Sequence, residues 1–273
     1  MDSSKNTQKA VWLDCDPGLD DTFAIILAGY NPSIKLIGIS TTQGNTNLEN
    51  TSRNACRVLH ASGIENVPVI KGVQGPLFRD EYNDDDQGEV AEDVHGKDGL
   101  STKEGESFPT DVPLKPITSN AIVTMYDKIK NYPEKVHLVA TGALTNVALL
   151  FKVFPDVMEN IEQLVFMGGA INYGNITPSA EANMIFDPEA AALVFKTKIK
   201  KVMVPLDVTH QVWVNDDVMK KIKSFNTRYT NILHGMLLFY RDAYHKIYEF
   251  DYSPLHDPCT IAYLIDSTMF KEQ

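Results

Sequence analysis

Apolar runs alternate along the chain with stretches whose apolar residues recur at helical spacing. The runs that predict strands are 10–13, 36–40, 67–70, 136–140, 164–167 and 202–204. The stretches that predict helices are 22–28, 48–62, 117–131, 145–154 and 188–195. This alternation predicts an α/β fold in a single domain, with a mainly parallel central sheet flanked by helices on both faces.

Two stretches fall outside this alternation. Residues 72–115 show no periodic pattern, and loops of that length within a domain are usually functional or disordered. Residues 224–249 predict one or two helices, and their apolar stripe indicates core packing. Three side chains in this second stretch are also candidates to face a cavity: Tyr229, Tyr244 and His245.

An acidic turn follows the first predicted strand. Asp14, Asp16, Asp20 and Asp21 lie between that strand and the first predicted helix, with a Pro-Gly turn among them. Open α/β sheets place their ligand sites at this edge, where the strands end. Like charges so close together repel, and a hard divalent cation is the simplest way to hold them. The alternative, a solvated surface loop, does not explain why acids interrupt an apolar strand.

Further candidates lie at the same edge of the predicted sheet. Asn45, Thr141 and Met167 each follow or end a predicted strand. Glu181 and Asn183 are expected on one side of an extended segment, because residues two apart in such a segment point the same way. These positions also have simpler interpretations, such as a surface acid at Glu181.

Composition narrows the class of protein. The 273 residues are 43% hydrophobic, which fits one globular domain, and residues 1–9 are polar and expected to be a flexible N-terminus. The net charge of −11 argues against nucleic acid or an anionic membrane as partner. Cys15, Cys56 and Cys259 are widely spaced, which favours reduced thiols. Without a signal sequence or a membrane-spanning run, the expected location is cytoplasmic.

Segment 14–21 reads DxDPGxDD, and with the later candidates in order it resembles the nucleoside hydrolase family, in particular its inosine-uridine-preferring branch. The resemblance covers most of the chain, about 11–263. It implies a Rossmann-like nucleoside hydrolase domain over 10–273, here expected to lack the usual C-terminal end. It also implies Ca²⁺-dependent hydrolysis of uridine- or inosine-type ribonucleosides, a role in purine and pyrimidine salvage, and a homodimer or homotetramer.

The resemblance assigns roles residue by residue. It implies that Asp16 is the general base and that Ca²⁺ is held by Asp16, Asp21, Asp257 and the main-chain carbonyl of Thr141. The residues that it places on the ribose are Asp20 and Asn183 at the ring hydroxyls, Asn175 and Glu181 at the 5′-hydroxyl, and Asn45 and Met167 in the pocket wall. The two histidines that it places on the base are His256, the leaving-group acid with a pKa expected near neutral, and His95, a second contact.

Two alternatives remain at the level of sequence. The chain could be a catalytically silent nucleoside-binding or structural relative. Less well supported is a haloacid-dehalogenase-like phosphatase, which also begins with Asp-x-Asp after its first strand but needs a later acidic pair at a strand edge. Asp216 and Asp217 come too late for that pair and begin a helix. One departure from the resemblance is Ala182, where many relatives have an aromatic residue; it leaves the substrate preference open.

Overall fold

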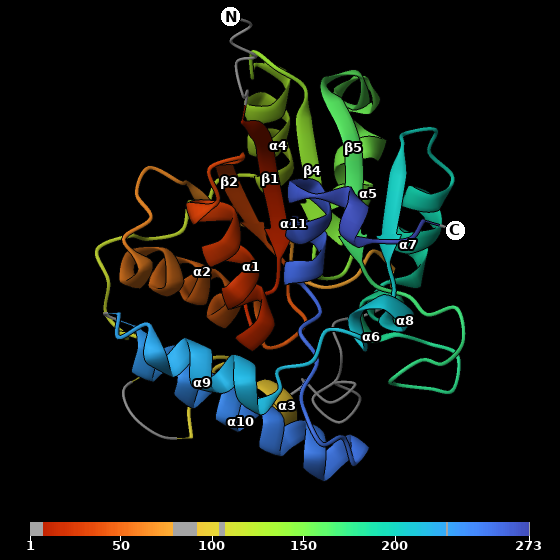
Figure 1. Ribbon diagram of the computed structural model, residues 1–273. Helices are drawn as coiled ribbons and strands as arrows, with labels where there is room; N and C mark the ends of the chain where they lie inside the picture. The colour runs from red at the N-terminus through yellow and green to blue at the C-terminus, as the bar shows by residue number, and fades with distance from the viewer. Residues whose placement is uncertain (1–7, 79–91, 104–106, 228, 273) are drawn as a thin grey trace, which may run out of the picture.

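A six-stranded sheet runs through the centre of the computed structural model, which describes residues 8–78, 92–103, 107–227 and 229–272 (Figure 1). All strand pairs in it are parallel, in the order β3-β2-β1-β4-β5-β6. The strands are β1 (Lys9–Cys15), β2 (Ile34–Thr41), β3 (Val69–Lys71), β4 (Val136–Ala140), β5 (Ile161–Met167) and β6 (Lys201–Val204). The predicted α/β fold with a parallel sheet is confirmed.

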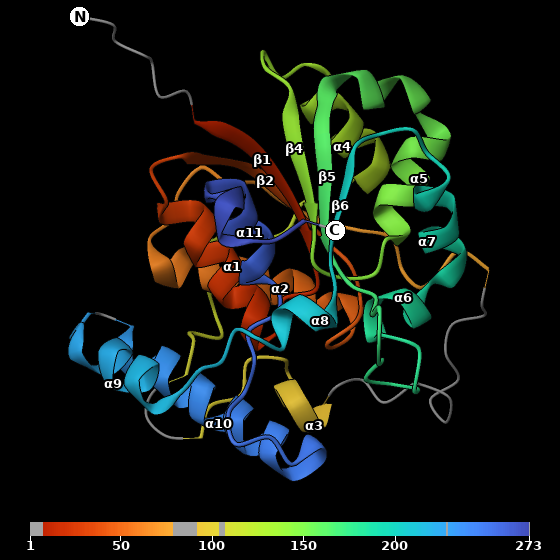
Figure 2. The same cartoon turned by 45° about the vertical axis from the view of Figure 1, so that its right-hand side comes forward.

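Helices cover both faces of this sheet (Figure 2). One face packs against α1 (Leu19–Tyr30), α2 (Leu48–Ser62) and α11 (Pro258–Ile265). The other packs against α4 (Ala121–Lys130), α5 (Thr145–Val153) and α7 (Pro188–Phe195). β1 is buried on both sides because its side chains alternate, so that Val11 and Leu13 enter the first core and Trp12 enters the second.

The remaining helices gather mostly beyond the carboxyl ends of the strands (Figures 1 and 2). They are α3 (Glu92–His95), α6 (Ala182–Phe186), α8 (Leu206–Thr209), α9 (Asp216–Ser224) and α10 (Thr230–Tyr248), with 3₁₀ turns at Pro155–Asn160 and Ser267–Met269. The strand order changes direction between β1 and β4, and a crevice for a ligand is expected outside the carboxyl ends of two such strands.

Most predicted elements are confirmed, and several keep their predicted bounds. Gly63 ends α2 in the left-handed conformation, at φ 69°. α4 begins four residues later than predicted, because the Asn120 side chain caps it. Segment 72–115 is not wholly irregular, since it contains α3. The predicted flexibility of residues 1–7 lies outside the described residues, whereas Lys9 already belongs to β1.

Among the helices that the structure describes, none combines the length and apolar character needed to cross a membrane.

Arg57 ties the long segment after β3 to helix α2. Its side chain is 1% exposed, and it donates to Asp98 Oδ2 at 2.9 Å and to Asn54 Oδ1 at 2.9 Å. It also donates to two main-chain carbonyls, those of Phe108 at 3.0 Å and Pro109 at 2.9 Å. Removing the guanidinium would therefore leave the buried acceptors on Asn54 and Phe108 unpaired, together with the part-buried ones on Asp98 and Pro109.

The substitution Arg57→Met should lower the free energy of unfolding by about 3 kcal/mol, because it strips these acceptors of their donor. Urea unfolding followed by circular dichroism measures the change. Arg53→Met, on the exposed side of the same helix, is the control and should change stability by no more than about 0.5 kcal/mol. Equal losses in the two variants would contradict the anchoring role.

Candidate functional site

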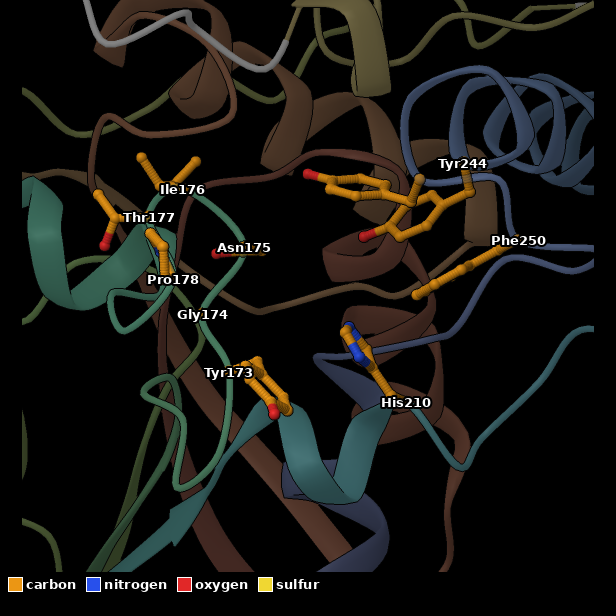
Figure 3. Close-up of a pocket in the computed structure, with 10 residues that line it drawn as sticks. Tyr173, Gly174, Asn175, Ile176, Thr177, Pro178, His210, Tyr244 and Phe250 are labelled. Carbon is orange, nitrogen blue, oxygen red and sulfur yellow. The ribbon is translucent and has the colours of Figure 1, made fainter.

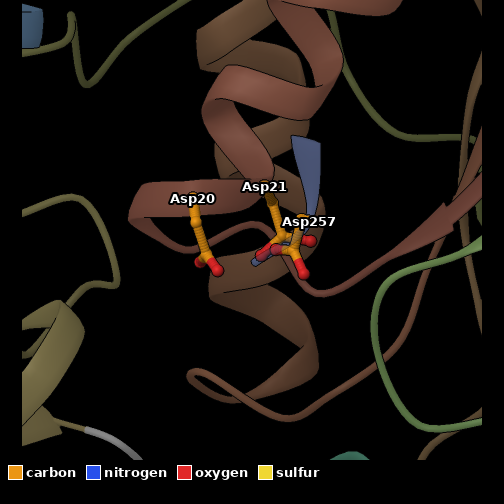
Figure 4. A group of neighbouring side chains, drawn as sticks. All are labelled: Asp20, Asp21 and Asp257. Atoms are coloured by element: carbon orange, nitrogen blue, oxygen red, sulfur yellow. The ribbon is translucent and has the colours of Figure 1, made fainter. Parts of the chain in front are cut away.

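Four buried aspartates meet at the carboxyl edge of the sheet. Asp16, Asp20 and Asp21 come from the turn between β1 and α1, and Asp257 comes from the residue that precedes α11. Each is no more than 4% exposed. One carboxylate oxygen from each of Asp20, Asp21 and Asp257 lies within 4.8 Å of the others (Figure 4). The fold thus brings residues from both ends of the chain into one acidic cluster.

This acidic cluster has unsatisfied oxygens. Asp16 Oδ1 and Asp20 Oδ1 are buried without a hydrogen-bond partner. Across the described residues, no lysine or arginine nitrogen forms an ion pair with any of the four carboxylates. Burial and then the neighbouring charges raise the pKa of Asp20 to about 7 and those of Asp16 and Asp257 well above their usual value. Such crowded, orphaned carboxylate oxygens fit a hard divalent cation.

Asp21 is held rigidly within the cluster. Its Oδ1 accepts the Thr141 hydroxyl at 2.8 Å, and its Oδ2 accepts Asn45 Nδ2 at 2.9 Å and the Gly18 amide at 3.0 Å. These bonds link the turn after β1 to the ends of β2 and β4. Asp257 occupies the N-cap position of α11 but makes no side-chain capping bond, so helix capping does not account for its buried carboxylate.

Asp16 is enclosed by backbone. Its Oδ2 accepts the Asn45 amide at 2.9 Å. A Cβ built on Gly142 would lie 2.6 Å from Asp16 Oδ1, closer than real Cβ contacts come. Glycine is therefore required there, and it lets the chain after β4 pass directly beside the carboxylate.

Glu181 and Asn183 do not share an extended segment, so that prediction is wrong. Glu181 caps α6, and its carboxylate accepts the amides of Asn183, Met184 and Gly169. Asn183 belongs to that helix, and its Nδ2 donates to the Thr141 carbonyl at 2.8 Å and to the Met167 carbonyl at 3.3 Å. The helical turn still delivers both side chains to the ends of β4 and β5.

His256 lies in a buried chain of hydrogen bonds. Its Nε2 is 2.7 Å from the Tyr244 hydroxyl, and its Nδ1 is 2.7 Å from Thr209 Oγ1. Burial, with smaller contributions from two other histidines, lowers its pKa to about 3. The near-neutral pKa expected from the sequence is therefore wrong, and the resting imidazole is neutral.

His95 is not a surface loop residue. It lies in α3 at 5% exposure, and its Nδ1 accepts the Leu19 amide at 3.0 Å. That nitrogen is also 4.0 Å from Asp20 Oδ1, and burial lowers the histidine pKa to about 3. His95 thus packs against the start of α1, beside the acidic cluster, while its predicted contact with a base stays a prediction.

A cavity of about 490 Å³ opens beside this site (Figure 3). The residues that line it are Tyr173, Gly174, Asn175, Ile176, Thr177, Pro178, His210, Tyr244, Tyr248 and Phe250. The four aspartates are not among them; the connection runs through Tyr244, which lines the cavity and bonds His256, the neighbour of Asp257. The site therefore consists of the acidic cluster and, beside it, this cavity, which we call the aromatic side chamber.

Sequence reasoning identified part of this chamber. Asn175 and Tyr244 were candidates, and the Oδ1 of Asn175 accepts the Ala182 amide at 3.0 Å. His210, Tyr248 and Phe250 were missed. For His210 a signal existed, since it follows the end of β6 by six residues and so lies at the same sheet edge as the aspartates. His245 is exposed and lines no part of the cavity.

Comparisons with known proteins agree with this architecture. The family model described as inosine-uridine preferring nucleoside hydrolase matches residues 11–273. The chain is 41% identical to a probable ribonucleoside hydrolase of Dictyostelium discoideum, over 96% of this chain and 78% of that protein. It is 40% identical to the pyrimidine-specific ribonucleoside hydrolase RihA of Shewanella woodyi, over 97% and 82%.

A solved structure, the purine-preferring ribonucleoside hydrolase from Gardnerella vaginalis, superposes with a TM-score of 0.88 at 33% identity, over 96% of this chain and 82% of that one. The phosphatase alternative loses support, and Asp216 and Asp217 in fact begin the surface helix α9, where Asp216 pairs with Arg241. The chain belongs to the inosine-uridine preferring nucleoside hydrolase family and is a nucleoside N-ribohydrolase.

Proposed function

We propose that this enzyme hydrolyses uridine- and inosine-type ribonucleosides to ribose and free base in a Ca²⁺-dependent reaction, as a cytoplasmic homodimer or homotetramer of the nucleoside salvage route. The observation that carries the catalytic part is the cluster of four buried carboxylates with two unpartnered oxygens, adjacent to a cavity lined by aromatic rings. The carboxylate cluster supports the binding of a cation and an attacking water, and the aromatic cavity supports the binding of a planar base.

The ion is proposed to bind Asp16, Asp21, Asp257 and the Thr141 carbonyl. All four are buried, oxygen is the only donor type, and Ca²⁺ accepts six to eight such oxygens. When bound, the ion supplies positive charge that lowers the pKa of a nearby water. Asp20 Oδ1, which also lacks a partner, then stays free for a ribose hydroxyl.

Asp16 acts as the general base in this proposal. Its unpartnered Oδ1 takes a proton from the attacking water while the C1′–O bond forms and the bond from C1′ to the base breaks. The buried carboxylates around it stabilise the positive charge that develops on the ribose ring.

The proposed ribose contacts use the side-chain amide atoms of Asn183 and Asn175 that make no hydrogen bond among the described residues. Asn183 uses its Nδ2 on the backbone, so its Oδ1 can accept a ring hydroxyl. Asn175 uses its Oδ1 on the Ala182 amide, so its Nδ2 can donate to the 5′-hydroxyl. Glu181 supports the same hydroxyl, and Asn45 and Met167 line the ring.

The departing base takes its proton on the side of Tyr244. Burial raises the pKa of this phenol well above 10, so it keeps its proton at neutral pH, and it lines the cavity directly. Neutral His256 lies 2.7 Å from the phenol oxygen and orients it, and the proton that Tyr244 gives to the base is replaced from solvent once the base has left. The proposed leaving-group role of His256 therefore acts through Tyr244.

Metal-free protein should lose stability as pH rises from about 4 to about 7. The folded-state pKa of Asp20, about 7, exceeds the unfolded value of about 3.9, so the folded state binds more protons across this range and deprotonation favours unfolding. Urea unfolding in chelator at about pH 5 and 7.5 measures the slope, which Asp20→Asn should reduce. Excess Ca²⁺ should raise stability at the higher pH, and no response to Ca²⁺ would argue against the metal site.

Asp16→Asn should lower kcat for ribose release by about 10²- to 10⁴-fold, and Asp16→Ala should abolish turnover, because each removes the base. The assay is reducing-sugar release from inosine, uridine, adenosine and cytidine, with and without chelator. Asp216→Asn, an exposed acid on α9, is the control and should keep full activity. Folded, Ca²⁺-bound wild type without release from any nucleoside would favour the catalytically silent relative.

Tyr244→Phe and His256→Ala should each lower kcat for inosine and uridine by about 10²-fold and spare nitrophenyl riboside, whose leaving group needs no proton. The test is to measure kcat of each variant with inosine, uridine and nitrophenyl riboside. Tyr132→Phe, which precedes β4 at the opposite edge of the sheet, serves as the control. Equal losses on natural and nitrophenyl substrates would remove both residues from the leaving-group role.

A further inference from the structure

We propose that His210 hydrogen-bonds the polar edge of the departing base and so helps to determine which bases this enzyme accepts. The inference rests on the proposed nucleoside hydrolysis and concerns the aromatic side chamber, where no role has been assigned to this residue. It begins from the position of His210 at the C-cap of α8, where its own backbone N–H donates to the carbonyls of Leu206 and Val208.

The ring of His210 forms part of the cavity wall. Figure 3 shows it beside Phe250 and across the cavity from the segment that carries Asn175. Because Asn175 is the proposed partner of the 5′-hydroxyl, a nucleoside held there would carry its base along this cavity. The His210 ring centroid is 5.5 Å from that of His256, so His210 also borders the proposed proton-donating pair.

His210 differs from the two other site histidines in its free polar groups. Within the described residues, His256 has both ring nitrogens engaged and His95 has its Nδ1 engaged, whereas no hydrogen bond involves the ring of His210. A neutral imidazole offers one donor and one acceptor, and burial lowers the pKa of His210 and favours that form. The carbonyl and N–H edges of uracil and hypoxanthine are complementary to such a pair.

Packing holds the ring in a fixed orientation. Phe250 meets it edge-to-face, with centroids 5.5 Å apart and planes at 87°, and Trp213 packs on Phe250 at 5.4 Å. Tyr248 and Phe250 offer apolar surface to a planar base, and His210 adds the hydrogen-bonding group. The ring nitrogens of His210 are not among the buried unpartnered atoms of the described residues, so they are reachable from the cavity and free to bond a ligand there.

The test compares His210→Phe, which keeps an aromatic ring but removes both nitrogens, with His210→Gln, which keeps a donor and an acceptor. His210→Phe should raise KM for inosine and uridine and lower kcat/KM by about tenfold, to different extents for the two. Its kcat/KM for nitrophenyl riboside should stay within about twofold of wild type. His210→Gln should recover part of the loss on natural nucleosides. His60→Phe, at the far end of α2, is the matched control and should be silent.

Inhibition by free uracil and hypoxanthine gives a second readout on the same proteins. His210→Phe should weaken inhibition by both free bases by about tenfold, as it does kcat/KM for the natural nucleosides. A merely structural role would not weaken base binding while sparing nitrophenyl riboside. Unchanged inhibition and an unchanged inosine-to-uridine ratio in active His210→Phe would overturn the role of His210 alone. Wild type that releases no ribose from any riboside would instead overturn the proposed function.

Discussion

The structure depends on the burial of several carboxylates in one place where, among the described residues, no lysine or arginine pairs with them. A charged group in a dry site is costly, so the surrounding backbone must either supply donors or leave room for a cation. Here it does both: Asp21 accepts hydrogen bonds from donors in three segments, while Asp16 and Asp20 each keep one oxygen without a partner. This combination requires the ends of β1, β2 and β4 to meet, and a parallel sheet that reverses its order at β1 provides that meeting.

A second layer of buried polar groups supports the acidic cluster from within the sheet. Asp14 accepts hydrogen bonds from Ser40 and Asn146, and Asn146 also donates to the Thr41 carbonyl. Asp187 accepts the Thr145 hydroxyl and so fixes the start of α5 against α7. These bonds join β1, β2 and the starts of α5 and α7, so the position of Asp16 is determined by the sheet and its helices and not by its own turn alone. Preorganisation of this kind is what a site needs to stabilise developing charge.

Sequence predicted the parts of this arrangement that depend on local pattern. The alternation of apolar runs gave the sheet and its helices, and the acidic turn placed Asp16, Asp20 and Asp21 at the carboxyl edge. The surroundings of individual side chains could not be predicted in the same way. The depressed pKa of His256 comes from burial by distant segments, and Glu181 became a helix cap because its carboxylate meets amides on both sides of it in the chain. The burial of His256 arises from tertiary contacts that no local spacing encodes. The capping bonds from the first turn of α6 to Glu181 are local, but glutamate is not among the residues preferred at the N-cap, so the pattern did not indicate them.

The two halves of the site differ in how freely they can change. The acidic cluster is held by hydrogen bonds between residues at the ends of β1, β2 and β4, so a substitution there disturbs several elements at once. The aromatic chamber is built from α8, the end of α10 and the segment before α6, which lie outside the sheet. A pyrimidine-specific and a purine-preferring ribonucleoside hydrolase each match this chain over nearly its whole length. If the proposed ribose contacts lie at the acidic cluster and the base lies in the separately built aromatic chamber, preference can change while the chemistry is kept.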